Sequence, residues 1–99
     1  MSTYALVAVW RMDPALAEAQ QRGLEERVIP FARSQPGFVQ GRWTRGADGM
    51  RHVAFVEFDS AEHAEAFAAV VRSAAQSENQ AAAGVTNESL DILEVIGAA

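Results

Sequence analysis

The sequence predicts an α+β fold of four strands and two helices in the order βαββαβ, and three observations support this. A β-hairpin pattern occupies the middle of the chain, from residue 36 to residue 59, where two runs of β-branched and aromatic residues flank a glycine-bracketed turn at residues 46–49. One helical pattern precedes this hairpin and a second follows it. A strand-like apolar run lies near each end of the chain.

The first strand is expected over Tyr4–Trp10, a continuous apolar run typical of a strand buried on both faces. A helix start follows at Asp13 and Pro14, because aspartate can cap free N–H groups and proline suits the first helical position. Pro30 is expected to end or kink this helix near residues 28–29, with at most a short extra turn beyond it. The apolar stripe of the helix comprises Leu16, Ala19, Gly23, Leu24 and Val28.

The central hairpin allows a prediction of its register. A four-residue loop at residues 46–49 places Trp43 opposite His52 and Gly41 opposite Ala54. One face then carries Val39, Gly41, Trp43, His52, Ala54, Val56 and Phe58. The other face carries Phe38, Gln40, Arg42, Thr44, Arg51, Val53, Phe55 and Glu57.

The second helix is expected to begin after Ser60, which is a favourable N-cap residue. Its apolar stripe comprises Ala64, Phe67, Ala68, Val71 and Ala75. Residues 76–88 lose this pattern and predict a frayed helix end and a loop, and Leu90–Ile96 forms the last strand. This order is the split βαβ, or ferredoxin-like, arrangement: a four-stranded antiparallel sheet with both helices on one face.

The chain of 99 residues is expected to form one domain over residues 1–99. Two helices can cover only one face of its sheet, yet the first strand is apolar on both faces. Phe38, Val53 and Phe55 add to the uncovered face. Because an exposed apolar patch of this kind is unusual for a monomer, we expect a homodimer formed through the open face of the sheet.

Composition excludes several classes of function. The formal net charge is −5, and the eight basic residues, all arginine, do not cluster, which argues against nucleic-acid binding. The absence of cysteine excludes disulfides, thiolate metal sites and a cysteine nucleophile. No apolar run approaches the roughly 20 residues that span a bilayer, so no membrane partner is expected. The N-terminal residues lack a signal-peptide pattern, which makes the cytoplasm the expected location.

Several short stretches together resemble a known family. These are Pro36–Val39, Phe55–Glu62, Ala64–Phe67 and Gly84–Leu90, and they resemble the antibiotic-biosynthesis-monooxygenase-type (ABM) domains of the dimeric α+β barrel superfamily over essentially the whole chain. The resemblance implies a dimer with a pocket between sheet and helices in each subunit. Some members oxidise polycyclic aromatic substrates with molecular oxygen and without metal or flavin. Others degrade haem through an Asn, a Trp and a His, and the resemblance implies that the Trp and the His lie on or just after the second helix. The corresponding positions here do not supply them, which disfavours haem degradation.

The candidate catalytic residues are His52, Trp43 and Arg42. Tryptophan can stack on a planar ligand, and an imidazole with a pKa near 6.5 can move a proton at neutral pH, which suits deprotonation of a phenolic substrate. The alternative is that Trp43 belongs to the core or the dimer interface and that His52 is a half-exposed residue near the turn. No metal site is expected, because His52 and His63 have no known ligand spacing, and no cofactor is expected either.

Two functions stay open. The first is a cofactor-independent monooxygenase acting on a small aromatic or polyketide-type substrate, which requires a closed, mostly apolar pocket of about 300 Å³ or more. The alternative is a non-catalytic dimeric small-molecule-binding or accessory domain, in which helix side chains fill the space above Gly41 and Ala54.

Overall fold

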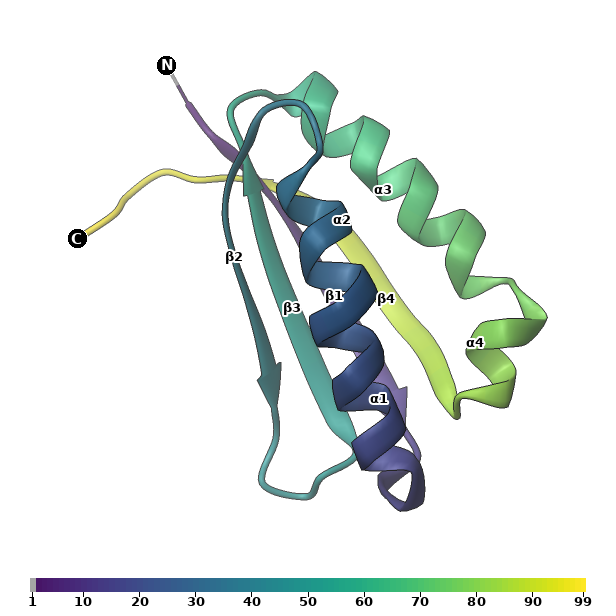
Figure 1. Ribbon diagram of the computed structural model, residues 1–99. Helices are drawn as coiled ribbons and strands as arrows, with labels where there is room; N and C mark the ends of the chain where they lie inside the picture. The colour runs from purple at the N-terminus through teal and green to yellow at the C-terminus, as the bar shows by residue number, and fades with distance from the viewer. Residues whose placement is uncertain (1) are drawn as a thin grey trace.

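The computed structural model describes residues 2–99, except for the side chains of residues 78 and 79. Its strands are β1 (Tyr4–Met12), β2 (Phe38–Arg45), β3 (Arg51–Phe58) and β4 (Val85–Glu94). They form one antiparallel sheet in the order β2-β3-β1-β4, and the helices pack on one face of it (Figure 1). The predicted ferredoxin-like βαββαβ fold is therefore confirmed.

The first helical layer is one continuous helix built of four segments (Figure 1). These are the 3-10 turn η1 (Pro14–Leu16), α1 (Ala17–Gly23), the π-helical turn η2 (Leu24–Val28) and α2 (Ile29–Arg33). As expected, Asp13 caps its start, with Oδ1 accepting from the N–H of Ala15 at 2.9 Å. The expected end of the helix near residue 28 is not observed, because the chain passes through Pro30 as helix. In η2, the N–H of Ile29 donates to the carbonyl of Leu24, and this wider turn accommodates a ring that would clash with an α-helical carbonyl.

The core lies between the sheet and α3 (Ala61–Ala75). Ser60 caps this helix as predicted, its Oγ accepting from the N–H of His63 at 3.1 Å. The buried side chains of α3 are Ala64, Phe67 and Ala68, members of the predicted stripe, and they pack against Leu6, Val56 and Phe58 of the sheet. The rings of Phe58 and Phe67 have centroids 5.2 Å apart.

The first helical layer is much less buried than α3. Of the residues that the structure describes in η1, α1 and η2, none is buried. Leu16 is 37% exposed, Val28 is 42% exposed and Ala19 is exposed as well, so the predicted burial of the stripe is wrong at these three positions. Ala32, in α2, is the buried residue of this layer. The layer therefore meets the sheet closely near its C-terminal end and stands away from it elsewhere.

The register of the hairpin differs from the prediction. The observed pairs are Arg45–His52, Trp43–Ala54 and Gly41–Val56. The carboxylate of Asp48 accepts from the N–H groups of Met50 and Arg51 at 2.9 and 3.1 Å, and these bonds hold a loop at residues 47–50 instead of 46–49. The predicted Trp43–His52 pair is therefore wrong. Because each residue of β2 is offset by two positions, the alternation of faces from Gln40 onward is nevertheless as predicted.

A β-bulge at the start of β2 reverses the alternation there. Phe38 pairs with Phe58, and Gln40 pairs with Glu57, so Val39 is an extra residue. Phe38 consequently lies on the helix-covered face, its ring 6.2 Å from that of Phe58, while Val39 is 46% exposed. The predicted faces of these two residues are therefore wrong: Val39, and not Phe38, was expected on the same face as Phe58.

The last strand begins earlier and ends earlier than predicted. A short helix, α4 (Glu78–Ala82), lies within the predicted loop, and Gly84 then turns the chain with φ +70° into β4. The pairing of β4 with β1 shifts between Val9 and Trp10. There the amide of Asn87 donates to the carbonyls of Val9 and Ser89 at 3.1 and 3.0 Å, which satisfies the interrupted ladder.

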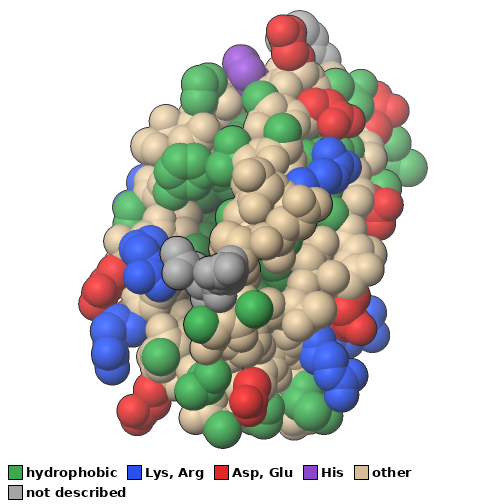
Figure 2. Space-filling model, turned by 90° about the vertical axis from the view of Figure 1, so that its right-hand side faces the viewer, with side chains coloured by type: hydrophobic (Ala, Val, Ile, Leu, Met, Phe, Trp, Pro, Cys, Tyr) green, Lys and Arg blue, Asp and Glu red, His purple; other side chains and the backbone are tan. Residues whose placement is uncertain are grey.

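The face of the sheet without helices, the open face, carries every second side chain of each strand. Val7, Val9, Val53 and Phe55 are partly buried there by their neighbours, and Leu93 is 51% exposed. Figure 2 shows a different side of the molecule, the side of α3 and α4, where acidic and basic side chains are interspersed. No helix in the described part of the chain is long and apolar enough to cross a membrane.

Candidate functional site

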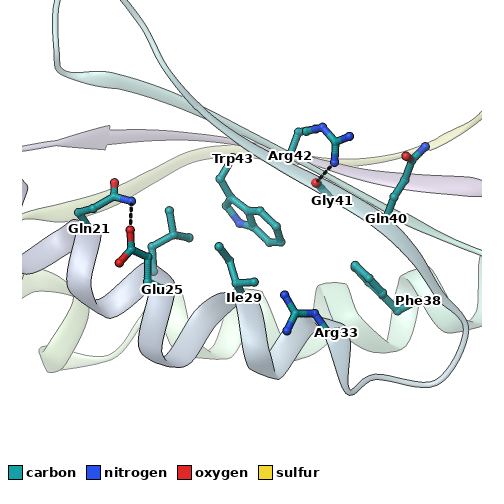
Figure 3. Close-up of a pocket in the computed structure, with 10 residues that line it drawn as sticks. Gln21, Glu25, Ile29, Arg33, Phe38, Gln40, Gly41, Arg42 and Trp43 are labelled. Atoms are coloured by element: carbon teal, nitrogen blue, oxygen red, sulfur yellow. Dashed lines mark hydrogen bonds between the residues drawn. The ribbon is translucent and has the colours of Figure 1, made fainter.

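A groove of about 520 Å³ lies between the first helical layer and the edge strand β2 (Figure 3). We call it the β2 groove. Its apolar lining comprises Leu24, Ile29, Phe38 and Trp43, and its polar lining comprises Gln21, Glu25, Arg33, Gln40 and Arg42, with Gly41 between them. The groove forms because the first helical layer stands away from the sheet over most of its length. It is open to solvent, whereas the oxygenase hypothesis predicts a closed pocket and the accessory-domain alternative predicts a filled space.

Trp43 and Gly41 form the strand side of the β2 groove. A Cβ atom at Gly41 would lie 2.7 Å from Cη2 and 2.8 Å from Cζ3 of Trp43, so the six-membered ring of the indole occupies the space that a side chain would need. Gly41 does not have a positive φ, so the glycine is required here by space and not by backbone conformation. The indole is thereby fixed against the strand with its free side toward Ile29 (Figure 3).

The two ends of the β2 groove carry different polar groups (Figure 3). At one end, Nε2 of Gln21 donates to Oε1 of Glu25 at 2.9 Å. At the other end, the guanidinium of Arg33 points from α2 toward β2, beside Phe38. The groove is therefore apolar in its middle, with a carboxylate at one end and a guanidinium at the other.

Of the three predicted catalytic residues, the β2 groove brings two together. Trp43 and Arg42 line it, but Arg42 extends on the outer side of β2, where Nη1 donates to the carbonyl of Gly41 at 2.8 Å. His52 does not line the groove; it lies at the hairpin end of β3, opposite Arg45 of β2 and Trp10 of β1. Burial and then the charge of Arg45 lower the pKa of His52, which favours the neutral imidazole.

Of the ten residues that line the groove, sequence reasoning singled out Trp43 and Arg42 as site residues, and Ile29, Arg33 and Phe38 are among those that it missed. Arg33 and Ile29 were missed because Pro30 indicated a helix end, so the residues around it were not placed over the sheet. Phe38 was missed because the bulge at Val39 leaves no pattern that separates it from regular alternation.

Outside the β2 groove, the carboxylate of Glu57 lies on the open face of the sheet, and this residue is only 8% exposed. Its carboxylate accepts from Oγ1 of Thr3 at 2.6 Å and from Nε2 of Gln40 at 3.0 Å. These hydrogen bonds lower the pKa of Glu57, so the side chain is held as a carboxylate with both oxygens satisfied. The buried charge of the open face therefore already has its hydrogen-bond donors, while Arg42 and Asp91 lie on the same face opposite Phe55 and Val7.

The remaining titratable pair, Asp59 and His63, is explained by the start of α3. Oδ1 of Asp59 lies 2.6 Å from Nδ1 of His63, and both side chains are about half exposed on the first turn of the helix. Within the part of the chain that the structure describes, no cluster of three or more His, Cys, Asp or Glu residues could hold a metal ion.

No protein-family model matches the chain, and no curated protein sequence matches it. Solved structures do match. A monooxygenase of Streptomyces coelicolor, solved in complex with nanaomycin D, is 20% identical with a TM-score of 0.73, covering 99% of this chain and 91% of its own. A dimeric ferredoxin-like protein from an uncultured marine organism is 12% identical with a TM-score of 0.72, covering 100% of both chains. A cofactor-independent oxygenase of Streptomyces nogalater is 19% identical with a TM-score of 0.62, covering 99% of this chain and 97% of its own.

At these identities the likeness concerns the fold, and it extends over nearly the full length of each partner. The chain thus shares the ferredoxin-like fold of these solved structures, two of which are oxygenases.

Proposed function

We propose that this chain binds a small planar aromatic molecule in the β2 groove and oxidises it with molecular oxygen without a metal or an organic cofactor. The observation that carries the proposal is the indole of Trp43, which is fixed over Gly41 as a flat apolar wall facing a groove of about 520 Å³. Aromatic rings stack on such a surface with a gain beyond simple area burial. The shared fold with two oxygenases, one of them described as cofactor-independent, supports the choice of reaction.

An anthrone is the type of substrate that fits this chemistry. Its ring methylene carries acidic hydrogens, and loss of one proton gives an electron-rich carbanion that can reduce molecular oxygen directly. The methylene carbon then gains one oxygen atom as a carbonyl, and the other oxygen atom leaves as water with the two hydrogens. In this proposal Trp43 orients the ring system and Arg42 lies at the rim, while His52, which is outside the groove lining, serves as the base through a bridging water.

Oxygen uptake with a panel of anthrones and phenols tests the proposal. We expect uptake by the wild type to fall at least tenfold in Trp43→Ala, because the stacking surface and its share of substrate positioning are lost. The matched control is Trp10→Phe, which alters the other tryptophan outside the groove lining and should leave uptake within about twofold. Rates at the uncatalysed background for the whole panel would contradict the oxygenase assignment. An unchanged rate in His52→Ala would contradict the role of His52 alone.

One observation favours the second candidate function, a non-catalytic small-molecule-binding module. Among the described residues that line the β2 groove, none is a histidine, so the predicted base, His52, is not placed in the groove. Binding of the same compounds without oxygen uptake, measured by calorimetry, would support this candidate against the first.

We further propose that two copies pair through the open face of the sheet. Val53 and Phe55 are only partly buried on that face, and Leu93 is 51% exposed, while the helices cover the opposite face alone. Glu57 already has hydrogen bonds to both oxygens, so a second sheet can cover it without leaving a bare charge. A dimeric protein of the same fold supports this arrangement.

Analytical ultracentrifugation at micromolar concentration tests the pairing. We expect the wild type to sediment as a dimer and Leu93→Glu to sediment as a monomer, because the substitution introduces a charge on the proposed interface. Val70→Glu is the matched control, since Val70 is similarly exposed at 43% but lies on α3, and it should stay dimeric. A monomeric wild type would contradict the proposal.

A further inference from the structure

The guanidinium of Arg33 is an unexplained cation at one end of the β2 groove. Arg33 belongs to the last turn of α2 and is exposed, and its side chain points over the groove toward β2 (Figure 3). Among the described residues, it takes part in no ion pair, and the pair of Asp59 and His63 is elsewhere in the fold. A charged side chain that extends over an apolar groove without a partner is suited to a ligand of opposite charge.

Arg33 is not needed to complete the end of its own helix. A basic residue in the last turn often serves the free carbonyl groups there. Here those carbonyls have other donors: the N–H of Ser34 donates to Pro30 and Phe31 at 3.2 Å, and the N–H of Gln35 donates to Ala32 at 3.1 Å. Oγ of Ser34 adds a bond to the carbonyl of Phe31 at 2.7 Å.

The other two charged groups that line the groove are placed differently. Arg42 is engaged with the carbonyl of Gly41 on the outer side of β2. Glu25 lies at the opposite end and holds Gln21 through one oxygen, which leaves its second oxygen free to accept. Arg33 follows Glu25 by eight residues, which at about 1.5 Å per helical residue places their backbones about 12 Å apart along the helix axis.

We propose that Arg33 is the specificity-determining residue of the β2 groove and that the preferred ligand is a planar aromatic carboxylic acid. The carboxylate pairs with Arg33, the ring system lies between Trp43 and Ile29, and Glu25 repels the acid from the other end. A hydroxyl group at the far edge of the ligand can donate to the free oxygen of Glu25. This inference rests on the proposed use of the groove as a ligand site.

Isothermal titration calorimetry on the full chain tests this proposal with two probes of similar size and shape. These are 2-naphthoate, which carries a negative charge, and 2-naphthamide, which is neutral. We expect the wild type to bind the naphthoate about five- to thirtyfold more tightly, the range of a charged hydrogen bond at a partly exposed site. Arg33→Gln should bring this ratio close to one without weakening the amide, and Arg33→Lys should restore part of it. Added salt should weaken binding of the acid only.

Arg27→Gln is the matched control, because it removes an equal charge from an exposed position of the same helical layer outside the groove lining, and it should keep the preference. An unchanged ratio in Arg33→Gln, or an equal loss of the ratio in Arg27→Gln, would overturn the role of Arg33 while leaving the groove as a ligand site. Failure of the wild type to bind either probe would overturn both proposals. Because Arg33 is exposed and makes no described hydrogen bond through its side chain, Arg33→Gln should unfold in urea at the wild-type midpoint.

Discussion

Replacing Gly41 with alanine should displace the indole of Trp43 from the strand. The new Cβ would lie 2.7 and 2.8 Å from two atoms of the six-membered ring, well inside van der Waals contact. The backbone of Gly41 is that of an ordinary strand, so it presents no obstacle to alanine itself. The perturbation is therefore a steric clash between the added methyl group and the indole of Trp43.

The expected magnitude follows from two opposing terms. Overpacking of one methyl group costs about 1–3 kcal/mol in a well-packed site. Removing a glycine from a strand returns about 0.5–1 kcal/mol, because glycine loses more conformational entropy on folding. Gly41→Ala should thus lower the free energy of unfolding by about 1 kcal/mol. In a Trp43→Ala background the first term disappears, and the same substitution should be neutral or raise stability by about 0.5–1 kcal/mol.

Urea unfolding of the four proteins of this double-mutant cycle provides the assay. We expect a coupling free energy of about 1–3 kcal/mol between the two positions. Gly97→Ala controls for a general effect of replacing glycine, since no atom lies within 4 Å of a Cβ there, and it should not change stability measurably. Coupling below about 0.5 kcal/mol would refute the inference that Gly41 is kept small by the indole. Gly41→Ala should also weaken binding in the β2 groove, because the displaced ring narrows it.

Three further outcomes are expected. Two side-chain hydrogen bonds lower the pKa of Glu57 from 4.5, so the wild type has this stabilisation above pH 4.5 and loses it as the pH falls through the lower folded pKa; urea unfolding from about pH 3 to pH 7 should show a flatter acid limb in Glu57→Gln, and parallel curves would contradict it. Burial and Arg45 lower the pKa of His52 from 6.5, so stability present above pH 6.5 should decline as the pH falls toward the folded pKa, and His52→Gln should remove that decline; an equal decline in the variant would show that another group causes it. Ser60→Ala should cost about 1 kcal/mol in thermal or urea unfolding, because the N–H of His63 loses its acceptor; a loss under about 0.3 kcal/mol would mean that water replaces the cap.

The fold was predictable because its signals are local. Asp13 and Ser60 are capping residues directly before apolar periodicity, and both caps are formed as expected. The stripe of α3 and the apolar run of β1 report burial through spacing alone. These signals fix the order of elements, and the order of elements with two helices leaves few arrangements of the sheet.

The groove was not predictable in detail because it arises from departures from regular geometry. The π turn at Leu24–Val28 allows the helix to pass Pro30, and the bulge at Val39 turns Phe38 inward. The loop held by Asp48 shifts the hairpin register by two positions and separates Trp43 from His52. The π turn and the bulge depend on hydrogen bonds between backbone groups and have no side-chain pattern that distinguishes them from the regular alternative. The loop depends on hydrogen bonds to the carboxylate of Asp48, and an aspartate at this position suits either register of the hairpin.

The wall of the β2 groove that is formed by residues 14–28 contributes little to the core, since none of those described side chains is buried. Substitutions at such positions usually change stability by less than about 0.5 kcal/mol. Mutation can therefore alter the shape and charge of this wall while the opposite half of the molecule, around Phe58 and Phe67, continues to keep the chain folded. Because different residues form the groove wall and the core, this fold can change its ligand by substitutions in the wall without a prior gain in stability.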